Sequence, residues 1–74
     1  MQDTKVLWSA QAIGEAAGEV WSLLKSRGKS TLSAIEREVD SPQGLTQMAI
    51  GWLAREGKIE LSQDKRSVQV WLTE

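Results

Sequence analysis

The sequence predicts a single α+β domain in which three helices are followed by a two-stranded β-hairpin. Apolar residues recur at helical spacing over residues 13–53, and over residues 59–73 they change to the alternation that is typical of strands. In addition, a chain of 74 residues can bury only one small core. We therefore expect one domain over residues 9–74, preceded by an N-terminal arm over residues 1–8.

The first helix is expected to begin after Ser9, whose hydroxyl can accept a hydrogen bond from the free backbone N–H groups at a helix start. It is expected to end before Gly28, because glycine readily takes the left-handed conformation that follows a last helical turn. The residues that recur on its predicted inward face are Ile13, Ala17, Val20 and Leu24.

Two further helices are predicted next, joined by a tight turn. Thr31 can cap the shorter helix, which is expected to end at Asp40. Ser41 is expected to cap the longer one, with Pro42 in its first helical position and Gly57 as its stop. The predicted inward residues are Leu32, Ile35 and Val39 in the shorter helix and Leu45, Ala49, Ile50 and Leu53 in the longer one.

After residue 57 the apolar residues alternate with polar ones, first over residues 59–62 and again over residues 68–73. The polar stretch 63–66 lies between the two runs, and this arrangement predicts a β-hairpin. A helix, a helix-turn-helix pair and a hairpin, in that order, form the winged helix-turn-helix layout, in which the hairpin is the wing.

Two segments carry a more specific resemblance, residues 13–21 (IGEAAGEVW) and residues 49–59 (AIGWLAREGKI). On these segments the chain resembles a family of small, stand-alone microbial winged helix-turn-helix proteins of unassigned function. The resemblance implies a three-helix core, a two-stranded wing and a homodimer. It implies no activity, no cofactor and no catalytic residue.

The composition argues against catalysis. The chain has no His, no Cys and no Tyr, so it lacks the commonest general base and any thiolate nucleophile. We expect a non-enzymatic protein without a cofactor or metal ion. Because no stretch approaches the roughly 18 apolar residues of a membrane span, we also expect a cytoplasmic location and no membrane contact.

Five polar side chains are candidates for contact with DNA: Gln47, Arg55, Lys58, Lys65 and Arg66. Gln47 and Arg55 lie on the outward side of the third helix, the element that reads base edges in a helix-turn-helix protein. Lys65 and Arg66 lie at the predicted wing tip. Because few cations are available for phosphate contacts, and because Gly44 and Gly51 leave the outward face of the third helix sparse, we expect DNA binding to be weak, salt-sensitive and nearly sequence-blind. The alternative is that these charged side chains are ordinary solvated surface residues that contact no DNA.

Eight residues are candidates for a protein interface: Gly14, Gly18, Trp21, Gly44, Met48, Gly51, Trp52 and Trp71. Glycines beside large apolar side chains make a smooth surface that is typical of protein contacts. Three plainer explanations stay open. The glycines of the third helix can simply be tolerated there, Val6 or Trp8 of the arm can fill the groove at Gly14 and Gly18, and Trp71 can cover a neighbouring strand pair.

Two functions therefore remain. The first is a homodimeric, DNA-associated protein with a role in transcription regulation, as the fold suggests by analogy. The second is a protein–protein interaction module that keeps the winged-helix scaffold without reading DNA.

Overall fold

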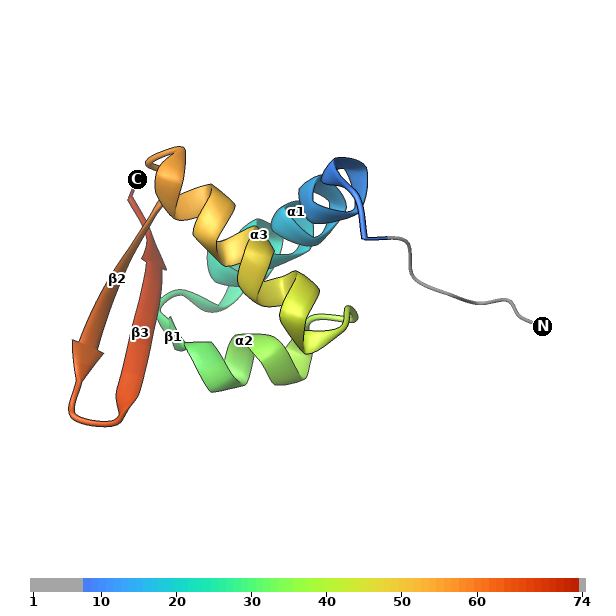
Figure 1. The fold of residues 1–74 in the computed structure, drawn as a ribbon. Coiled ribbons are helices and arrows are strands. Elements are labelled where there is room, and N and C mark those ends of the chain that lie inside the picture. Colours follow the sequence, from blue (N-terminus) through green and yellow to red (C-terminus); the bar gives the residue numbers. More distant parts are fainter. Residues whose placement is uncertain (1–7, 74) are drawn as a thin grey trace.

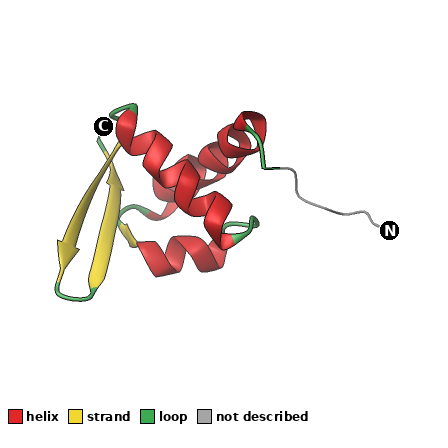
Figure 2. Ribbon diagram, viewed as in Figure 1, coloured by secondary structure: helices red, strands yellow, loops and turns green. Residues whose placement is uncertain are grey.

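The computed structural model describes residues 8–73 of the chain. In chain order the elements are α1 (Ala10–Arg27), β1 (Ser30–Thr31), α2 (Leu32–Glu38), α3 (Gln43–Arg55), β2 (Ile59–Asp64) and β3 (Ser67–Leu72). Figure 1 shows the three helices gathered on one side and the hairpin of β2 and β3 standing at their edge. The predicted winged helix-turn-helix fold is confirmed, and Figure 2 separates its helical and sheet parts by colour.

The predicted caps of the first two helices are present. The Ser9 hydroxyl accepts a hydrogen bond from the backbone N–H of Ala12 at 3.1 Å. The Thr31 hydroxyl accepts one from the N–H of Ala34 at the same distance. Gly28 follows α1 with a φ of 83°, in the left-handed region where glycine has no steric penalty. Local chemistry therefore fixes these three helix ends.

The second and third helices differ from prediction at their ends. Ser41 does not cap α3. Pro42 occupies the N-cap position, with a ψ of 145° and no side-chain hydrogen bond, and its carbonyl accepts from the N–H of Thr46 at 3.0 Å. Proline fixes φ but not ψ, so the same residue fits just before a helix as well as in its first position. The structure places the end of α2 at Glu38 instead of Asp40.

The sheet contains a third strand, β1, that the sequence analysis did not predict. β1 pairs antiparallel with β3 through Ser30↔Val70 and Thr31↔Gln69, so the strand order is β1-β3-β2. β3 is thereby the central strand. A strand of two residues is too short to show an alternation of apolar and polar residues, so only its pairing with β3 identifies it.

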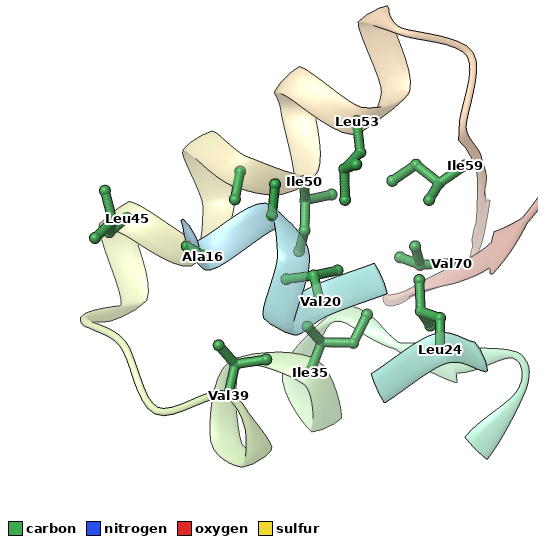
Figure 3. Close-up of a cluster of buried hydrophobic side chains, with 12 residues drawn as sticks. Ala16, Val20, Leu24, Ile35, Val39, Leu45, Ile50, Leu53, Ile59 and Val70 are labelled. Carbon is green, nitrogen blue, oxygen red and sulfur yellow. The ribbon is translucent and has the colours of Figure 1, made fainter. Parts of the chain in front are cut away.

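The core lies between the helices and the inner face of the hairpin. Figure 3 shows side chains from α1, α2, α3 and both hairpin strands pointing toward one another, among them Val20, Ile35, Leu53, Ile59 and Val70. α1 and α3 pack directly against each other. The inward residues predicted for α3 are all buried, and so are most of those predicted for α1 and α2. Ile13 and Leu32 are half-buried against the core.

Thr46 of α3 is a buried polar residue that the sequence analysis did not anticipate. Its side chain is fully shielded from solvent, and its Oγ1 has no hydrogen-bond partner among the described residues. A buried hydroxyl without a partner lowers stability by about 1–3 kcal/mol.

We expect Thr46→Val to raise the free energy of unfolding by about 1 kcal/mol, measured by urea denaturation. Thr46→Ala, which also leaves a cavity, is the control and should lower it; loss of stability in the valine variant would contradict the prediction.

Candidate functional site

The wing tip is a two-residue turn made by Lys65 and Arg66. Both side chains are exposed, and the flanking Asp64 and Ser67 are the last paired residues of the hairpin. Lys65 has a φ of 59°, the left-handed conformation in which glycine is usually found. For a residue with a side chain, that conformation costs about 1–2 kcal/mol. Lys65 therefore occupies a strained backbone conformation that glycine would adopt without this energetic cost.

The other DNA candidates are exposed but do not all lie together. Gln47 lies near the middle of α3, and Arg55 is the last residue of that helix. Lys58 comes just before β2 and lines a groove between α1 and α3, at the opposite end of β2 from the wing tip. Lys58 thus lines the groove, and the contact of any of the five candidates with DNA stays a prediction.

A carboxylate on α2 lies beside Gln47. Glu36 accepts hydrogen bonds from Nε2 of Gln47 at 2.6 Å and from Nε2 of Gln43 at 3.1 Å. The sequence analysis singled out neither Glu36 nor Gln43. Gln43 lies one helical turn before Gln47 on the same side of α3, and this spacing could have identified Gln43 as a further candidate. Glu36 is eleven residues from Gln47, and only the packing of α2 on α3 brings them together.

Four interface candidates line one apolar groove between α1 and α3. Gly14, Gly18 and Trp21 come from α1, and Trp52 comes from α3; the groove has a volume of about 250 Å³. A Cβ atom added at Gly14 or Gly18 would meet nothing within 4 Å, so the floor of the groove is open. The Trp52 side chain beside it is 46% exposed. Figure 1 shows the two helices that form this groove side by side.

Trp8 of the arm covers a different glycine from the one considered in the sequence analysis. Its ring lies 2.9 Å from where a Cβ atom on Gly44 would stand, at the start of α3. Trp8 and Met48 also line a small pocket beside Gly44, and both are about half exposed. The arm therefore does not fill the groove at Gly14 and Gly18 through Trp8, and Val6 lies outside the described residues.

The remaining interface candidates differ in exposure. Trp71 is half-buried, and the Lys29 ammonium lies 4.7 Å from the centre of its ring. Trp21 is also half-buried, with Lys25 at 4.9 Å. Gly51, on the outward face of α3, meets nothing within 4 Å. Trp71 is thus partly covered by its own chain, and Trp52 is the most exposed of the three candidate tryptophans.

Neither a metal site nor a membrane span is found in the described part of the chain. Residues 8–73 contain no group of three or more acidic, His or Cys side chains placed to hold a metal ion. Of the helices described, none has the length and apolar character needed to cross a membrane.

Comparison with known proteins gives family and fold. The family described as "Winged helix-turn-helix domain (DUF2582)" matches residues 1–72. An uncharacterized protein from Methanocaldococcus jannaschii is 44% identical over 57 residues, which are 73% of this chain and 80% of that protein.

Two solved structures share the fold at low sequence identity. The Zalpha domain of Carassius auratus PKZ, in complex with Z-DNA, aligns with a TM-score of 0.71 and 21% identity over 84% of this chain and 98% of that one. Bordetella bronchiseptica BpsR, whose DNA binding is regulated by 6-hydroxynicotinic acid, aligns with a TM-score of 0.72 and 22% identity. That alignment covers 99% of this chain but 52% of BpsR. On the family match and the 44% identical relative, the chain belongs to the DUF2582 family of winged helix-turn-helix domains.

Proposed function

We propose that this chain is a non-catalytic, DNA-associated binding module that acts in transcription regulation. The observation that carries the proposal is the pair of exposed cations, Lys65 and Arg66, at the tip of the wing. The ligand of the Zalpha domain and the DNA binding of BpsR support it by analogy of fold.

The strained turn at Lys65 strengthens the argument. Strained residues persist where the surrounding structure imposes their conformation, and they are concentrated at functional positions; an exposed lysine at a wing tip can neutralise a DNA phosphate. Few such contacts are available on one copy of the domain, so affinity should be low and should fall steeply as salt rises.

We expect Lys65→Glu combined with Arg66→Glu to weaken binding to every duplex, because phosphate contacts do not depend on sequence. The loss should exceed that caused by Gln47→Ala. The measurement is fluorescence anisotropy with a short labelled duplex of random sequence, at low and at physiological salt. Affinity that survives the charge reversal but disappears in Gln47→Ala would contradict the proposal.

Lys65→Gly is the control for folding in this experiment. Glycine relieves the left-handed strain, so the free energy of unfolding should rise by about 1 kcal/mol. The same variant loses one cation, and its salt dependence should have a slope smaller by about one. A variant that is more stable and yet binds DNA less tightly separates the function of the wing from its folding.

The groove between α1 and α3 supports a second part of the proposal, a homodimer. The same surface carries open space at Gly14 and Gly18 and the partly exposed indole of Trp52. In a two-fold dimer both copies use the same patch, so the indole of each copy would pack over the glycines of the other. At about 250 Å³ the groove is smaller than most small-molecule pockets, which measure about 300–1,000 Å³. Side chains of a second copy are therefore its best-fitting occupant.

The second candidate function is a protein-interaction module without DNA binding. The observation that favours it is the exposed apolar side of α3, where Met48 and Trp52 are each almost half exposed. This alternative predicts that wild-type protein at low salt shows no binding to duplex DNA, whereas the DNA-associated function predicts measurable, salt-sensitive binding.

A further inference from the structure

Glu36 joins two glutamine side chains on the exposed side of α3. Its Oε1 accepts from Gln43 at 3.1 Å, and its Oε2 accepts from Gln47 at 2.6 Å. Both glutamines are exposed, whereas Glu36 is half-buried. The ion pair found among the described residues joins Arg27 to Glu38 and does not involve Glu36. The two amides are thus the partners of this carboxylate.

The chemistry of the carboxylate fixes how each amide is turned. A carboxylate accepts hydrogen bonds and donates none, so each glutamine must direct its nitrogen, and not its oxygen, toward Glu36. An amide nitrogen carries two N–H groups, and Glu36 uses one of them. Within residues 8–73, each glutamine therefore keeps one N–H and its oxygen available for a partner outside the protein.

One donor beside one acceptor is the combination that the major-groove edge of adenine requires, since adenine offers the N6 amino group and the N7 acceptor. Gln43 and Gln47 lie in the first turns of α3, the part of a recognition helix that approaches base edges. We infer that Gln43 and Gln47 read adenine in the major groove of duplex DNA, and that Glu36 is the positioning residue that holds both amides in register. This inference rests on the proposed DNA association, and it replaces the nearly sequence-blind binding expected from the sequence with a preference for A·T pairs.

Glu36 is expected to increase selectivity without increasing the affinity for random sequence. Holding two long side chains in place lowers the ordering cost of a specific contact, so loss of Glu36 should reduce discrimination between base pairs. Its negative charge also lies on the side of the protein that would approach phosphates, so its loss should not weaken binding to random sequence. A residue that only tied α2 to α3 would change stability without changing selectivity.

The experiment is selection from a library of duplexes with a randomised core at low salt, followed by sequencing of the bound fraction. It compares wild type with Glu36→Ala, Gln47→Ala and the matched control Glu38→Ala. Glu38 lies on the same helix and carries the same charge, but it pairs with Arg27 away from the amides. Urea denaturation of each variant records the change in stability separately.

We expect wild type and Glu38→Ala to enrich A·T pairs at one or two positions at least about fivefold, the lower end of discrimination by a bidentate contact. Glu36→Ala and Gln47→Ala should lose that enrichment while still binding the random library. Enrichment that survives in Glu36→Ala would overturn the positioning role. Wild-type binding without base preference would overturn the inference and leave the proposed function standing, whereas no binding at low salt would overturn both.

Discussion

Replacing Trp52 with alanine is expected to dissociate the proposed dimer without unfolding the single chain. Trp52 is 46% exposed in the single chain, so its truncation should cost the fold less than truncation of a fully buried side chain. At an interface, truncation of a buried tryptophan typically costs about 2 kcal/mol or more, or roughly thirtyfold in the dissociation constant. Because a two-fold dimer contains the residue twice, the loss should exceed this value. Sedimentation equilibrium over a range of protein concentrations measures the change.

The glycines of the groove provide an independent test of the same dimer. A Cβ atom at Gly18 meets nothing within 4 Å, so Gly18→Ala should stabilise the single chain by up to about 1 kcal/mol through helix propensity. If a second copy packs on the groove, the same substitution should weaken dimerisation. Ser22→Ala is the control, since Ser22 lies on the same helix, is exposed and is not among the groove residues. A wild type that sediments as a monomer at all concentrations would refute the proposed dimer.

The second large effect is expected in the core. Leu24 of α1 is 2% exposed and is among the largest fully buried side chains. Truncation of a buried leucine to alanine costs about 2–5 kcal/mol, through lost burial and the cavity that remains. Domains of this size lie toward the lower end of the roughly 5–15 kcal/mol that stabilises folded proteins. We therefore expect Leu24→Ala to remove a large part of the stability, measured as the midpoint of urea unfolding.

Leu61→Ala makes the same chemical change at an exposed position. Leu61 lies opposite Val70 on the hairpin but is 42% exposed, because it is beyond the edge of the core. Its truncation should cost much less than that of Leu24. Equal shifts of the two midpoints would show that the core does not close between α1 and the sheet as described.

The sequence by itself determined both ends of α1, the start of α2 and most of the buried stripes. Ser9, Thr31 and Gly28 act on backbone groups within a few residues of themselves, so their effects can be inferred without a tertiary structure. The inward residues of α3 follow equally from a period of 3.6 residues. The hairpin followed from alternation, because both strands are long enough to show it.

Only the tertiary structure decided which residues from different elements come into contact at the surface. β1 exists as a strand because β3 pairs with it, and Glu36 reaches Gln47 because α2 packs on α3. Trp8 lies against Gly44 instead of Gly14 and Gly18, a choice between glycines that spacing could not make. Helical wheels place residues on the faces of single helices. A groove, an amide pair or a covered glycine depends on the distance between elements far apart in the chain, which packing alone sets.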